Sequence, residues 1–206
     1  MPDPLNSFVG DRSASRFGHA DLDVTRLDFE ANEAALRDLT NNLSTAELNW
    51  QPEDRRAWSI LQCAEHLALA HGAYLGAMWP AVRGGKASGL RRKGPIRPSA
   101  TGALFLKKLE PPVTRKVRAP KVLVPAVDHN KDEVMAKFAR THEQIRDLIR
   151  DAADLDLNGI KFRNPLLPLL RVRAGTGLLI MAAHERRHLW QARQVRNALE
   201  HHGAIR

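Results

Sequence analysis

Apolar residues recur at steps of three and four along four long segments of the chain, which is the spacing of one face of an α-helix. The four predicted helices cover about residues 23–43, 59–79, 131–153 and 176–200. Ser59 and Gln62 form a capping-box pattern at the start of the second helix, and Pro80 disfavours its continuation. Strand-like alternation is scarce, and 117–127 offers at most one edge strand. The expected fold is all-α, a four-helix bundle with a long crossover between the second and third helices.

The breaks between these helices have their own signals. Ser44 is placed to cap a short turn after the first helix. Residues 155–175 contain Asn158-Gly159 and two prolines, which predicts a loop before the last helix. Thr176 is the expected cap of that last helix, and Gly203 is its stop signal.

The charge of the chain is concentrated in the crossover. The 206 residues hold 32 Lys and Arg against 23 Asp and Glu, a formal net charge of +9. Residues 83–121 hold 12 of the basic residues and one acid, Glu110, so this segment carries +11 and the rest of the chain carries −2. Its five glycines and five prolines exclude a continuous helix, apart from one short turn over 101–110.

The remaining composition bounds the class of protein. The length fits one domain over residues 1–206. No run of 18 apolar residues predicts a membrane span, and the first residues lack the apolar stretch of a secretory signal. Cys63, the only cysteine, excludes an internal disulfide framework and a cysteine-rich zinc finger. We therefore expect a cytoplasmic protein with no membrane association.

Two histidines share the inward face of the last predicted helix. His184 and His188 are four residues apart, so they lie on one face about one turn from each other. Steps of three and four from the pair give mainly apolar residues: Ile180, Met181, Ala192, Val195 and Leu199. The pair is therefore expected to point into the core.

His66 in the second predicted helix also faces inward, because its neighbours at helical spacing are mainly small or apolar. Neutral imidazole is a preferred ligand of Zn²⁺, Ni²⁺ and Fe²⁺. Three protein ligands leave a coordination position for water, as catalytic sites do. The alternative to a metal site is that these histidines are hydrogen-bonded residues of the core.

The segment HERRH also matches the H-E-x-x-H pattern of zinc proteases, in which the glutamate, here Glu185, is the general base. The sequence LWQARQV that follows lacks the glycine and third histidine of the metzincin extension. Glu200, in the same predicted helix, is the only glutamate further along. We therefore rank a protease low and expect Glu185 either at the surface or supporting a metal ligand.

Two segments together resemble the DinB/YfiT-like superfamily of metalloenzymes. WSILQCAEHLALAH resembles the family's W-S-x₆-H element, and HERRHLWQARQV resembles its H-x₃-H-x₂-Q element. The matching residues are Trp58, Ser59, His66, His184, His188 and Gln191. KVLVPAV with the third helix, and FRNPLLPLL before the fourth, are similar to the family as well, so the resemblance spans about 20–200.

The resemblance implies an up-and-down arrangement of four helices and a three-histidine site for a divalent metal, with His66, His184 and His188 as ligands. Zn²⁺ or Ni²⁺ is expected first, with Fe²⁺ or Mn²⁺ as alternatives. Known activities in the family include thiol-dependent transfer and maleylpyruvate isomerisation, and other members are described as hydrolases. The implied chemistry is Lewis-acid activation on a small-molecule substrate, in some members with a low-molecular-weight thiol. A homodimer is compatible with the family.

Several residues near these motifs could also belong to the site. Cys63 is expected to be a small buried apolar residue. His142 is read as a core histidine, a fourth ligand or a substrate contact. Trp58 is expected to pack where the chain enters the second helix, and Gln191 either to orient a ligand or to pack. The histidines that match no apolar stripe are expected at the surface: His71, His129, His201 and His202.

Two further functions compete with a metal-dependent enzyme. The basic segment 83–121 could bind nucleic acid or another anionic surface with salt-dependent affinity. Against this, Phe105 is its only aromatic residue, which disfavours base stacking, and no DNA-docking motif is present. The other alternative is a binding protein built on an enzyme scaffold, in which the metal is structural.

Overall fold

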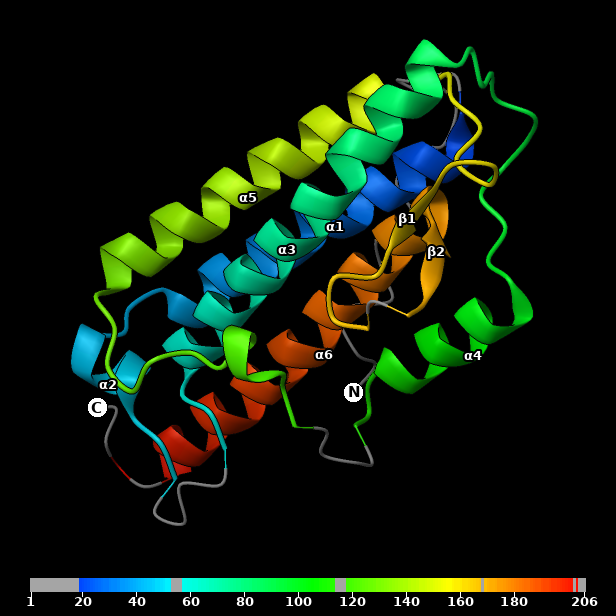
Figure 1. Ribbon diagram of the computed structural model, residues 1–206. Helices are drawn as coiled ribbons and strands as arrows, with labels where there is room; N and C mark the ends of the chain where they lie inside the picture. The colour runs from blue at the N-terminus through cyan, green and yellow to red at the C-terminus, as the bar shows by residue number, and fades with distance from the viewer. Residues whose placement is uncertain (1–18, 53–56, 114–117, 168, 202, 204–206) are drawn as a thin grey trace.

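A computed structural model describes residues 19–52, 57–113, 118–167, 169–201 and 203. Within this part of the chain the structure is mostly helical, with one short hairpin (Figure 1). The helices are α1 (Ala20–Thr40), α2 (Thr45–Asn49), α3 (Ile60–Ala87), α4 (Ala100–Leu109), α5 (Lys131–Asp151) and α6 (Ala174–His201), with a 3-10 turn at Lys121–Leu123. The strands are β1 (Lys161–Arg163) and β2 (Arg171–Arg173). The prediction of a helical fold is confirmed.

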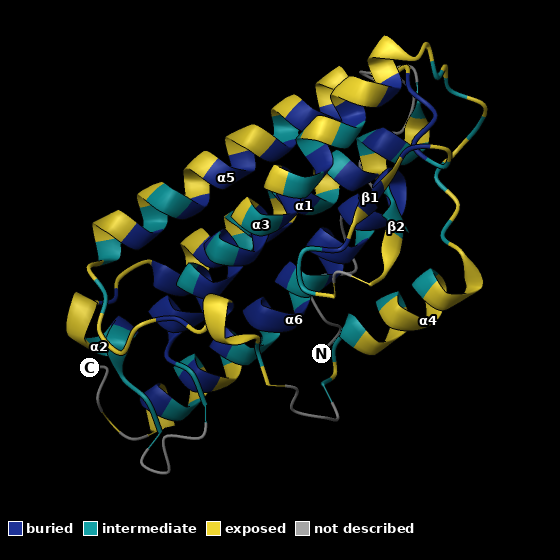
Figure 2. Ribbon diagram, viewed as in Figure 1, coloured by how far each residue is buried: buried dark blue, intermediate teal, exposed yellow. Residues whose placement is uncertain are grey.

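The four long helices α1, α3, α5 and α6 run alongside one another (Figure 1). α1 and α3 each pack against both α5 and α6, and α4 packs on the outer side of α6. Figure 2 shows exposed and buried positions alternating along α5, as expected of a helix with one face turned to solvent. None of the described helices has an apolar stretch long enough to span a membrane.

Reciprocal hydrogen bonds fix the start of α3, as the sequence pattern predicts. The Ser59 hydroxyl accepts from the backbone N–H of Gln62 at 3.1 Å, and the Gln62 side chain accepts from the backbone N–H of Ser59 at 3.0 Å. Gln62 also donates to the carbonyl of Ala126 at 2.8 Å, which ties the N-terminus of α3 to the segment before α5. Ser44 makes a second capping box, with Glu47, at the start of α2.

The prediction that the second long helix ends before Pro80 is wrong, because α3 continues to Ala87. A proline inside a helix removes the hydrogen bond to the carbonyl four residues earlier, here Gly76. Met78 and Val82, on either side of Pro80, are 0 % and 1 % exposed, so burial of both turns holds the helix together. The first residues of the basic segment 83–121 are therefore helical, and α4 is ten residues long rather than a single turn.

The predicted loop 155–175 contains a small antiparallel hairpin, in which Phe162 pairs with Val172. α6 begins at Ala174, two residues before the expected cap Thr176. The first two N–H groups of α6 donate to backbone carbonyls just before β1. Ala174 donates to Ile160 at 2.8 Å, and Gly175 donates to Leu157 at 3.0 Å. Backbone from the loop thus satisfies donors that a capping side chain would otherwise serve.

Side chains from α1 and α6 hold the connection between α3 and α5. Asp21 of α1 accepts from the Arg92 guanidinium at 2.6 Å and from the backbone N–H of Ile96 at 2.8 Å. Arg186 of α6 donates to both carboxylate oxygens of Glu110, which directly follows α4. The connection is therefore attached to the long helices at several points.

Candidate metal centre

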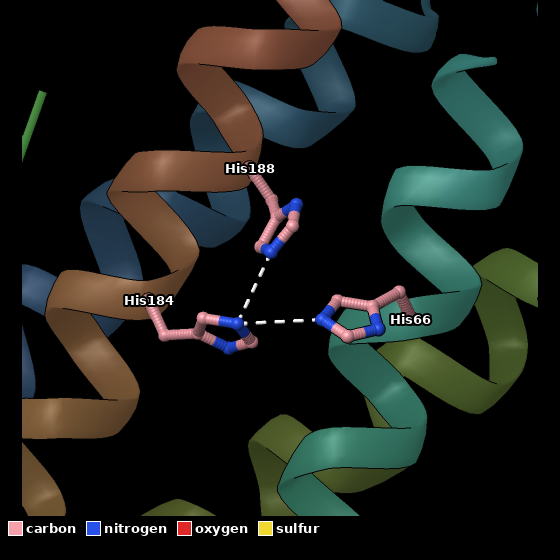
Figure 3. Close-up of side chains that lie close together, drawn as sticks. All are labelled: His66, His184 and His188. Atoms are coloured by element: carbon pink, nitrogen blue, oxygen red, sulfur yellow. Dashed lines mark hydrogen bonds between the residues drawn. The ribbon is translucent and has the colours of Figure 1, made fainter. Parts of the chain in front are cut away.

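Three imidazole rings meet between α3 and α6 (Figure 3). His66 comes from α3, and His184 and His188 come from successive turns of α6. The Nε2 atom of His184 lies 3.3 Å from Nε2 of His66 and 3.1 Å from Nε2 of His188. We call His66, His184 and His188 the three-histidine cluster. The structure thus brings together the three inward histidines that the sequence singles out.

The backbone fixes which nitrogen of His66 carries its hydrogen. Nδ1 of His66 lies 2.8 Å from the carbonyl oxygen of Leu123, in the 3-10 turn before α5. A carbonyl only accepts, so Nδ1 of the neutral ring is the donor and Nε2 holds a lone pair. That lone pair faces the other two histidines, which is the orientation that a metal ligand requires.

The surroundings keep all three rings neutral. Burial lowers the pKa of His66, and it lowers the pKa of His184 to about 3, with repulsion from His66 as a further cause. The pKa of His188 is also well below the ordinary value, because of burial and the proximity of His184. Uncharged imidazoles at neutral pH are ready to bind a cation, since protons do not compete for their lone pairs.

The three nitrogens cannot satisfy one another by hydrogen bonds alone. Nε2 of His184 faces Nε2 of both other rings: with a hydrogen it can donate to only one of them, and without a hydrogen its lone pair meets that of His66. Two ligands about 2.0–2.1 Å from one ion are separated by about 2.9–3.4 Å at angles between 90° and the tetrahedral value. The observed 3.1 and 3.3 Å fall within this range. The donor set and its spacing therefore fit a divalent transition metal.

Trp58 forms one wall of the three-histidine cluster. Its ring centroid lies 4.7 Å from that of His66 and 5.7 Å from that of His188, nearly parallel to the latter. Trp58 thus does more than pack at the entry to α3. Cys63 is 2 % exposed, and burial raises the pKa of its thiol to about 12, so it is the small apolar core residue that the sequence predicts.

Glu185 follows His184 in sequence but turns away from the three-histidine cluster. It is fully buried, and its carboxylate lies against His71 and His142. Burial alone would raise the pKa of Glu185, but these two histidines outweigh that effect and lower it to about 2. The expectation of a surface glutamate is wrong. The protease reading loses support as well, because that mechanism needs the glutamate beside the histidine pair.

The expectation that His71 lies at the surface is also wrong, since its exposed fraction is 0 %. A signal was present: steps of three and four from His71 give the apolar residues Leu67, Ala68, Tyr74 and Leu75. His142 is buried beside Glu185. Its ring lies with His71 and Glu185 and is not part of the three-histidine cluster. His201 is exposed and His129 half-buried, while His202 lies outside the described residues.

The basic segment 83–121 is largely exposed. Its described basic residues are all exposed except Arg92, which is paired with Asp21. Arg115 and Lys116 lie outside the described residues. Phe105 on α4 is 38 % exposed. These positions add no aromatic platform to the charge, so they do not strengthen the nucleic-acid alternative.

Comparison with known proteins gives one match. A family model described as the DinB superfamily matches residues 28–192, which is more than half of the chain and includes all three members of the three-histidine cluster. No curated protein and no solved structure matches the chain.

Proposed function

The chain belongs to the DinB superfamily, and from this membership and the three-histidine cluster we propose that it is a metal-dependent enzyme acting on a small molecule. The observation that carries the proposal is the convergence of three neutral Nε2 atoms, one of them oriented by the Leu123 carbonyl. His66, His184 and His188 would hold the ion. A bound divalent ion supplies Lewis acidity to water or to a substrate oxygen. Zn²⁺ or Ni²⁺ suits this donor set, with Fe²⁺ or Mn²⁺ as alternatives.

The protein residues prepare the site in three ways. Leu123 fixes the ring of His66, and the spacing of one helical turn fixes His184 against His188. Trp58 covers the rings of His66 and His188 and excludes water from that side. His184 is the least buried of the three, so substrate would approach from its side. These features hold the ligand atoms in place before an ion or a substrate arrives.

The architecture supports the same proposal. We treat α1, α3, α5 and α6 as the four-helix bundle of the family, with residues 83–121 as a basic crossover and residues 1–206 as one domain. Metal ligands on facing helices of such a bundle meet in its interior, as the histidines of α3 and α6 do here. The positive charge of the crossover would raise the local concentration of an anionic substrate.

The reaction is either hydrolysis or thiol-dependent transfer. If the reaction uses a thiol, the thiol comes from outside the chain. Cys63 cannot provide it, because it is buried and its pKa is raised to about 12, which leaves almost no thiolate at neutral pH. A low-molecular-weight thiol is then a second substrate. Consumption of added thiol distinguishes transfer from hydrolysis, which consumes water and no thiol.

The test is metal analysis of protein purified without a histidine tag. We expect wild type to retain a divalent ion, and His184→Ala to lose this ion from the three-histidine cluster. The control is His201→Ala, which removes an exposed histidine and leaves the metal content unchanged. Equal and negligible metal in wild type and His184→Ala, after loading with Zn²⁺ or Ni²⁺, would refute the proposal.

A further inference from the structure

A second group of ligating side chains lies in the interior, apart from the three-histidine cluster. His71 comes from α3, His142 from α5 and Glu185 from α6, and they are 0 %, 1 % and 0 % exposed. Nε2 of His71 lies 3.1 Å from Oε1 of Glu185, and Nε2 of His142 lies 2.8 Å from the same oxygen. We call these three residues the inner cluster.

The contacts within the inner cluster are short but do not have hydrogen-bond geometry. Nε2 of His71, Nε2 of His142 and Oε1 of Glu185 each lack a hydrogen-bond partner of ordinary geometry among the described residues. Buried polar atoms in proteins are nearly always satisfied, so three unsatisfied atoms in contact need an explanation. The three atoms lie within 4.8 Å of one another, close enough to bind a single ion.

The remaining polar atom of His71 indicates where its lone pair lies. The Thr141 hydroxyl donates its hydrogen to the carbonyl of Phe138 at 2.8 Å, so its oxygen accepts from Nδ1 of His71 at 3.3 Å. With its hydrogen on Nδ1, His71 has Nε2 as the nitrogen available to a metal ion beside the carboxylate of Glu185. A lone pair and a carboxylate oxygen in contact need a proton or a metal ion between them.

A hydrogen bond from α1 holds the carboxylate of Glu185. Oε2 of Glu185 accepts from the side-chain amide of Asn32 on α1 at 2.7 Å, which leaves Oε1 free to face the histidines. Nε2 of His142 is directed at Glu185, whereas its Nδ1 lies 3.7 Å from Oε2 of Glu33 on α1, which is too far for a hydrogen bond. A hydrogen bond such as the one from Asn32 orients a ligand in a metal site.

We propose that His71, His142 and Glu185 form a second metal site, which binds a divalent transition-metal ion such as Zn²⁺ and joins α3, α5 and α6. Of the two separations, 3.1 Å lies within the roughly 2.9–3.4 Å expected between a histidine nitrogen and a carboxylate oxygen on one zinc ion, and 2.8 Å lies at its short edge. The complete burial of the site assigns it a structural role, because no side is open to substrate. The proposal does not depend on the function proposed for the three-histidine cluster.

The experiment counts zinc ions per chain. Full-length protein without a tag is stripped of metal, loaded with Zn²⁺, freed of excess ion and analysed by mass spectrometry. We expect two ions per chain in wild type and in the control His201→Ala, one in His142→Gln, one in His184→Ala, and none in the double variant. Circular dichroism establishes that each variant is folded.

The outcomes separate the two sites. One ion in wild type that His184→Ala abolishes and His142→Gln retains overturns the inner site, and shows that protons alone join Glu185 to its histidines. One ion that His142→Gln abolishes and His184→Ala retains supports the inner site and overturns the function proposed above. If His142→Gln does not fold, anomalous scattering at the zinc edge from wild-type crystals decides. Density between His71, His142 and Glu185 supports the site, and its absence in zinc-loaded crystals overturns it.

Discussion

The carbonyl oxygen of Leu123 accepts a hydrogen bond of 2.8 Å from Nδ1 of His66, and this one contact makes the segment before α5 part of the candidate metal centre. Leu123 is 57 positions beyond His66 in the chain. Its side chain is 3 % exposed and anchors the 3-10 turn, whereas the neighbouring Val122 is 79 % exposed. The orientation of His66 therefore depends on the packing of a residue outside the helices that carry the three histidines.

The first prediction follows from that anchor. Leu123→Ala should let the turn shift and weaken the hydrogen bond to His66, and loss of such a supporting contact costs about 10- to 100-fold in metal affinity. Competition with a chromogenic chelator measures the affinity for Zn²⁺. Val122→Ala is the matched control and should bind as wild type does. Equal affinity of both variants would show that Leu123 does not position the ligand.

The second prediction concerns the stability of metal-free protein in acid. The pKa of His184 is about 3 in the folded state against 6.5 for an ordinary histidine, so the unfolded state binds more protons below pH 6.5. Its stabilising contribution is complete above pH 6.5 and declines as the pH falls toward 3. Between pH 7.5 and 5.0, wild type should lose about 1–2 kcal/mol more unfolding free energy than His184→Ala. Urea unfolding at the two pH values measures this, and parallel losses would contradict it.

The third prediction concerns close packing at the start of α6. A Cβ atom on Gly177 would lie 2.8 Å from the ring of Phe162, whereas a Cβ on Gly76 in α3 would have no neighbour within 4 Å. Gly177→Ala should therefore cost about 1–3 kcal/mol through overpacking. Gly76→Ala should stabilise by up to about 1 kcal/mol, because alanine is the better helix former. Urea unfolding of both variants measures whether the free energy of unfolding falls in Gly177→Ala and rises in Gly76→Ala.

The fourth prediction concerns Cys63. Its thiol is buried with a pKa of about 12, so it forms a thiolate and meets a thiol reagent only when the structure opens. Labelling of native protein at pH 8 should be about 10³-fold slower than labelling in urea, as an opening free energy of about 4 kcal/mol implies. Absorbance of the released chromophore follows the reaction. Fast labelling of native protein would place Cys63 at an accessible site instead.

The long helices could be predicted from the sequence, because apolar spacing reports which side of a helix is buried. Their ends were harder to predict. A proline such as Pro80 ends a helix when only local backbone preferences act. α3 continues through Pro80 because Met78 and Val82 are both buried in the core. The hairpin of β1 and β2 has three residues in each strand, too few for a recognisable alternation.

The candidate metal centre was also predictable only in part. The inward faces of His66, His184 and His188 follow from helical spacing, and the resemblance to the DinB superfamily joined them into one set. The contact between His71 and Glu185 could not be predicted, because it depends on how α3 and α6 pack. Local spacing also gives no information on the Leu123 carbonyl, which is a backbone group far away in the sequence.

The pairing of α3 with α6 has a consequence for motion. His66 and His71 are five residues apart in α3, or about 7.5 Å along its axis, and each contacts its own neighbour in α6, His184 and Glu185. A single cross-link would act as a pivot about which one helix could turn. The two contacts reach consecutive residues of α6 from positions about 7.5 Å apart on α3, so a turn about either contact would break the other, and α3 and α6 should move together. Any opening that admits a substrate must then come from the parts of the chain around α3 and α6.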